Sequence, residues 1–144
     1  MKLVDVETRL TSWAGSPLKA VGRAGDIQKA MEQSRGVPVS PSAFLVPIGD
    51  TAQPNRSATI AVIQQVAMTF GVLLAVRDVS DAKGGQAAGT IEDVKIAVRG
   101  RLVGWSPAPE DDLVELIGGG LVQLMNGTIW WLERYRTGFQ LRVT

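Results

Sequence analysis

The longest regular pattern in the chain is an alternation of large apolar with small or polar residues between Val62 and Val76. One alternate set is apolar at every position but one, and consists of Val62, Gln64, Val66, Met68, Phe70, Val72, Leu74 and Val76. A period of two predicts a β-strand with one face in a core. A strand of this length spans about 50 Å, well beyond the roughly five or six residues of a common strand. We therefore expect it either to bend at Gly71 or to pair, over its outer half, with another element.

Shorter patterns predict the remaining elements. Apolar stripes at helical spacing predict helices near residues 3–13, 27–31 and 90–105, with Asp26 and Thr90 as N-caps of the last two. Lys95, Arg99 and Arg101 are expected to face outward. Apolar runs predict strands at residues 18–22, 43–48, 114–117, 121–125 and 128–143, and polar loops at 49–59 and 78–89. The Asn126-Gly127 pair is a strong signal for a two-residue hairpin turn.

These elements indicate an α+β fold. The hairpin is antiparallel, and the helices are too few to cover both faces of a sheet. We expect a single domain over residues 1–144, in which a twisted, mainly antiparallel sheet has its helices packed on one face.

Composition narrows the function classes. The chain is 45% apolar and 20% charged, and its fifteen basic and fourteen acidic residues leave a net charge of +1. This balance argues against nucleic-acid binding by bulk charge. No apolar run reaches about 18 residues without polar interruption, so no membrane span is expected.

The residue types that carry most catalysis are scarce. The chain has no cysteine and so no thiolate chemistry. It also has no histidine, which removes the commonest general base and the commonest metal ligand. The acidic run at residues 110–112 lacks the alternate ligand spacing of a calcium loop. The glycine-rich loop from Gly84 to Thr90 enters a helix, where a phosphate can bind, but it lacks the lysine of a P-loop. We expect no catalytic, cofactor or metal site, and a small-ligand-binding domain that uses this loop is an alternative.

Two features of the last strand point to contacts with other proteins. Trp130 and Trp131 are adjacent, so in a strand they point to opposite faces, and only one of them is needed in a core. Arg134, Arg136 and Arg142 share one face of the same strand. Such a row of charges suits an acidic partner surface, and its reading as ordinary solvated charge stays open.

Four segments carry a family resemblance. They are AFLVPIGDTAQPNR, QQVAMTFGVLLAVRDV, DVKIAVRGRLVGWSP and GGGLVQLMNGTIWWLERYRTGF, which together run from Ala43 to near the C-terminus. In this order and spacing they resemble the tail terminator (tail completion) proteins of long-tailed bacteriophages. The resemblance implies an α+β virion subunit without enzymatic activity that forms a ring, typically a hexamer.

The same resemblance implies where the ring works. It would cap the tail tube at the head-proximal end of the virion tail, end tube polymerisation and present a surface to the neck, after assembly in the host cytoplasm. The implied partners are further copies of the chain, the tail tube protein and a head-to-tail connector or neck protein. DNA would pass through the lumen without specific binding. Another neck or tail-tube subunit is the alternative within the virion.

The resemblance supplies no matched functional residues, so the candidate contacts are inferred from the pattern. The loops at 49–59 and 78–89 flank the long strand at its two ends and are the expected axial contacts. The candidate contact residues are Asp50, Gln53, Asn55, Arg56, Gln64, Asp81, Lys83, Trp130, Arg134, Arg136 and Arg142.

Overall fold

A computed structural model describes residues 1–32, 37–77 and 85–144. In chain order the elements are α1 (Leu3–Thr11), β1 (Ala20–Arg23), α2 (Ala24–Met31), β2 (Ser42–Ala52), β3 (Val62–Arg77), α3 (Gly85–Leu102), β4 (Glu115–Met125) and β5 (Thr128–Val143). The five strands form one sheet in the order β1-β2-β3-β5-β4. Among the strand pairs of the described residues, the short β1–β2 pair alone is parallel, and the other three are antiparallel. The predicted α+β class with a mainly antiparallel sheet is therefore confirmed.

Helices cover both faces of this sheet. α1 and α3 pack on the face that carries the alternate set of β3 beginning at Val62. The core on this face consists of Val6, Leu10, Ala43, Leu45, Phe70, Val72, Leu74, Val76, Ile91, Val94, Val98, Leu102, Val114, Ile129 and Tyr135. α2 packs on the opposite face, near Phe44, Leu73 and Trp130. The expectation of helices on one face is wrong for α2, because the second alternate set is also apolar in the inner half of the sheet.

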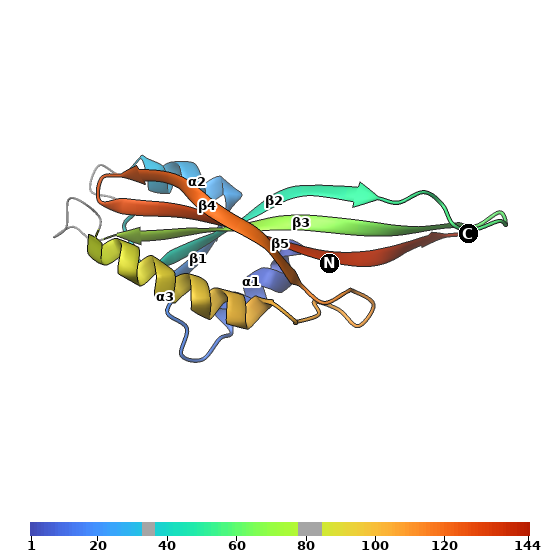
Figure 1. Ribbon diagram of the computed structural model, residues 1–144, viewed down its shortest axis with the longest axis horizontal. Coiled ribbons are helices and arrows are strands. Elements are labelled where there is room, and N and C mark those ends of the chain that lie inside the picture. The colour runs from blue at the N-terminus through green and yellow to red at the C-terminus, as the bar shows by residue number, and fades with distance from the viewer. Residues whose placement is uncertain (33–36, 78–84) are drawn as a thin grey trace.

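The long strand β3 extends far beyond the helices, and both of its neighbours extend with it. β3 pairs with β5 from Val62 opposite Val143 to Arg77 opposite Thr128. We call the outer part of the sheet the arm; it comprises residues 49–52, 62–69 and 136–143 with the connecting loop 53–61. Figure 1 shows the arm running past the helices to a tip where this loop and the C-terminus lie together. The outer half of the predicted strand thus pairs with two strands of its own chain.

The strand β2 extends further along the chain than the sequence pattern predicts. β2 continues through Ala52, and Gly49 to Ala52 pair with Thr69 to Val66 after a register shift between Pro47 and Gly49. The polar stretch expected as a loop at 49–59 is therefore a strand over its first four residues. This part of β2, which pairs with the alternating residues of β3, is polar. A prediction based on polarity alone therefore assigns it to a loop, although it is a strand.

Two helix starts also differ from expectation. α2 begins at Ala24, and the backbone N–H of Arg23 donates to the Asp26 carboxylate at 3.0 Å, so Asp26 lies inside the first turn. α3 begins at Gly85, five residues before the expected cap at Thr90. Most of the candidate phosphate loop is therefore helical, and Gly84 lies outside the described residues.

The predicted hairpin is confirmed, and the strand before it is longer than expected. Asn126 and Gly127 have φ of 53° and 72°, the left-handed values that this turn requires. The two strands expected at 114–117 and 121–125 are one strand, β4, with register shifts at Leu116/Gly118 and Leu121/Gln123. The glycine triplet between them is thus part of the sheet.

Candidate assembly surfaces

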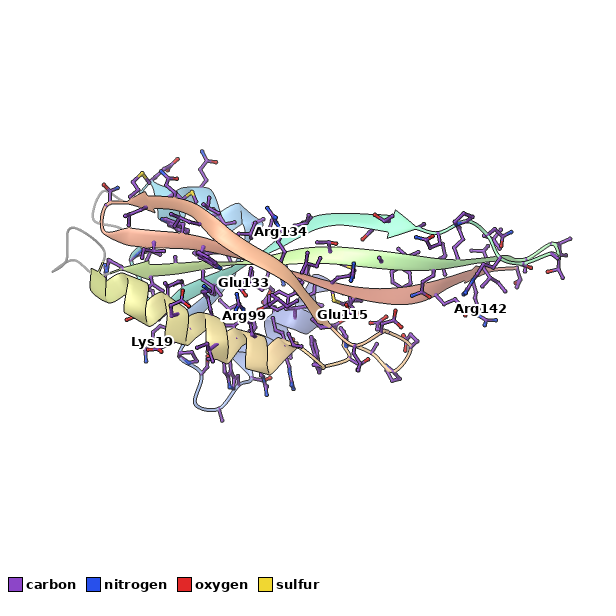
Figure 2. The ribbon with its side chains drawn as sticks, viewed as in Figure 1. Lys19, Arg99, Glu115, Glu133, Arg134 and Arg142 are labelled. Atoms are coloured by element: carbon purple, nitrogen blue, oxygen red, sulfur yellow. The ribbon has the colours of Figure 1, made fainter. Side chains whose placement is uncertain are left out.

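Opposite charges meet at a buried place beneath α3. The Glu133 side chain is fully buried, and its carboxylate accepts hydrogen bonds from Arg99 Nε at 2.7 Å and Nη2 at 2.8 Å. Trp131 Nε1 donates to the same carboxylate at 2.6 Å, and the Tyr135 hydroxyl lies 3.4 Å from it. Figure 2 shows Arg99 and Glu133 between the helix and the sheet. Since these three side chains all donate to one carboxylate, we read the group as a structural link between α3 and β5.

Lys95 and Arg99 turn toward the sheet, which corrects the expectation that they face outward. Lys95 is only 6% exposed, and its Nζ lies 3.8 Å from the centre of the Trp131 ring. A cation over an indole face is stabilised by the ring's quadrupole. Gly119 of β4 leaves room for this arrangement, because a Cβ there would collide with Glu133 and with Trp131 Nε1.

The buried network predicts an alkaline signature for Tyr135. Burial raises the pKa of its phenol above the ordinary value of 10.0, and the Glu133 carboxylate raises it further. A raised pKa means that the fold favours the neutral phenol, so this stability is present below about pH 10 and is lost as pH rises further. Tyr135 is the single tyrosine of the chain. We expect its ultraviolet absorbance to show no ionisation near pH 10 in the native protein.

The urea-unfolded chain is the control for this titration, and there the phenol should ionise near pH 10. A native circular dichroism spectrum combined with ionisation near pH 10 would contradict the buried placement of the phenol.

Two predicted contact residues, Asn55 and Gln64, help to shape the tip of the arm. Asn55 Oδ1 accepts from the backbone N–H of Ile63 at 2.9 Å and of Ser57 at 3.0 Å. Gln64 Nε2 donates to the carbonyl of Gln53 at 3.0 Å. These side chains are therefore partly engaged in holding the loop at 53–61.

The other predicted residues of the arm leave their side chains exposed. Asp50 lies in β2 opposite Met68, and Arg56 follows Asn55 in the tip loop. The backbone N–H of Arg56 donates to the carbonyl of Ile63 at 3.0 Å, which fixes its backbone while its side chain is exposed. The arm thus presents an acidic side chain from β2 and a basic side chain from the braced tip loop.

The three arginines of β5 share one face, as the alternation predicts, and all are exposed. Arg136 pairs with Glu115 at 3.1 Å, and Arg142 donates to Gln140 at 2.8 Å. Figure 2 shows Arg134 and Arg142 far apart along the strand. They form a line along β5 rather than one cluster, so a partner would have to follow the strand to contact all three.

Three predicted contact residues are not found on the described surface. Trp130 is 1% exposed, and its ring lies 5.8 Å from the ring of Phe44 in the core beneath α2. It has no surface to offer a partner here, because α2 covers the face on which it lies. Asp81 and Lys83 lie outside the described residues.

The most apolar exposed strand of the sheet, β4, was not predicted as a contact surface. Its exposed apolar side chains are Leu116, Ile117, Leu121, Val122 and Leu124. β4 stands at the end of the strand order, and among the described residues no strand pairs with its outer side. The sequence contained a signal for this surface, because apolar residues flank the glycine triplet on both sides. The same pattern is equally typical of a strand buried in the core.

Sites for metals or membranes are not found in the described parts of the chain. Across residues 1–32, 37–77 and 85–144, no three potential metal-ligating side chains lie together. No helix within the same ranges has the length and apolar character needed to cross a bilayer.

Comparison with known proteins gives one family. The family described as phage tail terminator protein matches residues 5–144, which is nearly the whole chain. The comparison with curated proteins gives no match.

Proposed function

The chain belongs to the phage tail terminator family and is a structural protein of a phage tail, and from this premise we propose that it ends the growth of the tail tube. It does so as a ring, with six copies as the expected number, that seats on the last layer of the tube. Its opposite face receives the connector or neck protein. DNA passes through the lumen without specific binding, and the protein performs no enzymatic reaction.

The family match carries this proposal, and the shape of the subunit supports it. A terminator must present one surface to the tube and a different surface to the neck. The braced tip of the arm, at residues 53–61, lies at the end of the sheet away from the helices (Figure 1). A subunit with two such distant ends suits a ring that bridges two different partners.

The surface charge is compatible with a role between proteins and DNA. The net charge is +1, and β5 presents its arginines along a line that includes Arg136, which is neutralised by Glu115 at 3.1 Å. A lumen must let DNA move, and dense positive charge would instead hold the phosphate backbone.

The experiment that tests the proposal is a reconstruction of the virion neck by electron cryo-microscopy, in the phage that encodes this protein. We expect a single ring of this chain between the last tube layer and the connector. Density for the chain repeated along the whole tube would instead make it a tube subunit. A ring at the distal tip, or no copy of the chain in the virion, would refute the proposed role.

A further inference from the structure

The outer edge of β4 lacks most of the features that protect a free sheet edge. Exposed edges recruit other strands, and natural proteins usually blunt them with lysine, proline or short length. β4 has eleven residues, ELIGGGLVQLM, of which Glu115 is the only charged one, and contains no proline. In β4, Leu121 is 60% exposed to solvent and Val122 is 51% exposed. Two register shifts twist the strand, but they leave its apolar side chains uncovered.

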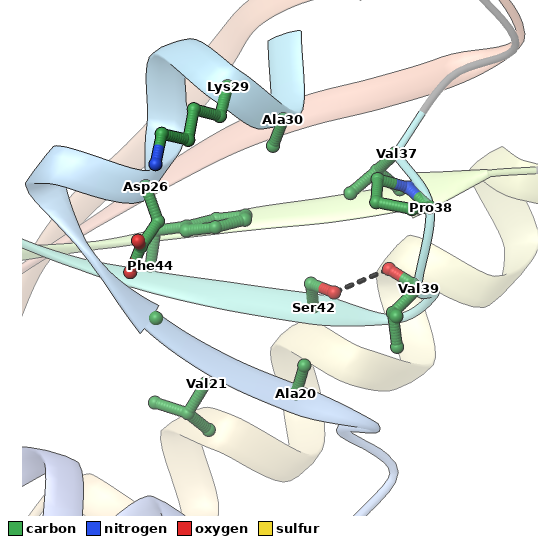
Figure 3. Close-up of a pocket in the computed structure, with 11 residues that line it drawn as sticks. Ala20, Val21, Asp26, Lys29, Ala30, Val37, Pro38, Val39, Ser42 and Phe44 are labelled. Atoms are coloured by element: carbon green, nitrogen blue, oxygen red, sulfur yellow. Dashed lines mark hydrogen bonds between the residues drawn. The ribbon is translucent and has the colours of Figure 1, made fainter. Parts of the chain in front are cut away.

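The opposite edge of the same sheet carries a cavity. β1 ends the strand order on that side, and a cavity of about 300 Å³ lies between β1, α2 and the segment before β2. Figure 3 shows Phe44 in the lining of this cavity, across from Val37 and Val39, with Ala30 on the α2 side. The lining is mainly apolar, and Asp26 and Lys29 lie on the α2 side.

Strand directions allow the two edges to meet when copies are arranged in a ring. β1 is parallel to β2, and each later step across the sheet reverses direction, so β4 runs antiparallel to β1. When copies are related by rotation about an axis parallel to the strands, each strand keeps the same direction in every copy. β4 of one copy would therefore meet β1 of the next in the antiparallel sense that the rest of the sheet uses. Such a contact joins two different surfaces, which is the requirement for a closed ring.

Charge at the two edges is also complementary. Exposed acids precede and begin β4, at Glu110, Asp112 and Glu115. The β1 side carries Lys19 and Arg23, and Arg23 pairs with Glu7 at 2.6 Å across the surface. In an antiparallel contact the start of β4 lies toward the end of β1, which brings these acids toward Arg23, while Lys19 lies at the far end of the contact. Glu115 and Arg23 also pair within their own copy, with Arg136 and Glu7. Exposed pairs contribute only about 0–1 kcal/mol, so they favour this orientation more than they strengthen it.

We propose that the occupant of the β4 edge is a second copy of this chain. β4 pairs antiparallel along the β1 edge of the neighbour, and apolar side chains of β4 enter the cavity between β1 and α2. This inference rests on the proposed function, because a ring built from one chain needs two complementary surfaces on each copy.

The test uses two variants of the full chain, one for each edge, in sedimentation velocity over a range of concentrations. Val122→Lys places a charge on β4, and Val39→Lys places one at the cavity, where Val39 is 42% exposed. Each is expected to raise the concentration needed for assembly at least about tenfold. Val143→Lys, at a 56% exposed valine of the arm, is the matched control and should assemble as the natural chain does. Circular dichroism must show all three variants folded.

Mixing the two variants distinguishes this contact from a symmetric one. Val122→Lys keeps an intact cavity and Val39→Lys keeps an intact β4, so the mixture should form heterodimers that neither variant forms alone. A β4–β4 pair would overturn the proposal, and it would appear as dimers of Val39→Lys with no gain on mixing. Unchanged assembly of Val122→Lys, or a natural chain that stays monomeric at every concentration, would overturn it as well. Heterodimers on mixing, together with normal tails in a phage that lacks the protein, would leave the contact standing and remove the proposed function instead.

Discussion

Replacing Arg99 by methionine is expected to lower the free energy of unfolding by about 3–5 kcal/mol. The substitution leaves the Glu133 carboxylate fully buried without the guanidinium that now lies 2.7 Å from it. Trp131 Nε1 still donates at 2.6 Å and the Tyr135 hydroxyl at 3.4 Å, but these neutral donors do not offset the desolvation of a charge. Urea unfolding followed by tryptophan fluorescence, with both proteins at the same concentration, measures the loss.

Glu133→Gln is the matched control for this prediction. The amide oxygen can still accept from Trp131, and the Arg99 side chain is 35% exposed, so water can solvate the freed guanidinium. We expect a smaller loss, about 1–2 kcal/mol, and a double variant that loses less than the sum of the two. A loss below about 1 kcal/mol for Arg99→Met would mean that the pair behaves as a surface ion pair and does not anchor α3.

Phe70→Ala is the second large effect, with an expected loss of about 3–5 kcal/mol. Phe70 is fully buried, and its ring stacks on Tyr135 with centroids 5.6 Å apart. It stands in β3 at the point where the arm leaves the part of the sheet that the helices cover. Removing the ring leaves a cavity against β5 that the surrounding strands can fill only partly. Urea unfolding gives the measurement here too.

The control for Phe70 lies eight residues earlier in the same strand. Val62 is half-buried and paired with Val143 at the tip end of the arm. Val62→Ala should cost less than about 1 kcal/mol, because no helix packs over this end of the arm (Figure 1). Similar losses for the two variants would show that the arm is packed like the core, which the account does not allow.

Local patterns in the sequence were sufficient to predict the long strand and the hairpin. Alternation from Val62 to Val76 depends only on the pleat of one strand, and the turn at Asn126 and Gly127 depends only on two backbone angles. The core beneath α2, on the opposite face of the sheet, was harder to predict from the sequence. The unbroken apolar run from Val72 to Val76 indicates a strand buried on both faces, and this signal could have placed α2 correctly.

The buried charge pair could not be predicted from spacing. Arg99 and Glu133 are 34 residues apart, and their contact depends on which turn of α3 lies over which residue of β5. A partial signal existed, since Glu133 occupies the same alternate set as Trp131 and Tyr135, where a lone carboxylate needs a partner.

The structure places some of the candidate contact residues at the surface, such as Arg134, and buries Trp130. The adjacency of Trp130 and Trp131 correctly placed the two rings on opposite faces, but which one was covered depended on α2. The polar residues near Asn55 do lie at a tip, since β2 and β3 form an extended hairpin. The apolar β4 edge was missed because strand order in the sheet, and not strand pattern, determines which strand is left at an edge.

Tail length is the most direct measurement of the central role, in particles from a phage that cannot make this protein. The account predicts tubes that overrun the length of mature tails and that fail to join heads, with both defects reversed when the natural chain is supplied. Electron micrographs of the lysate provide the length distribution. Tails of normal length, joined to heads in the absence of the protein, would contradict the account.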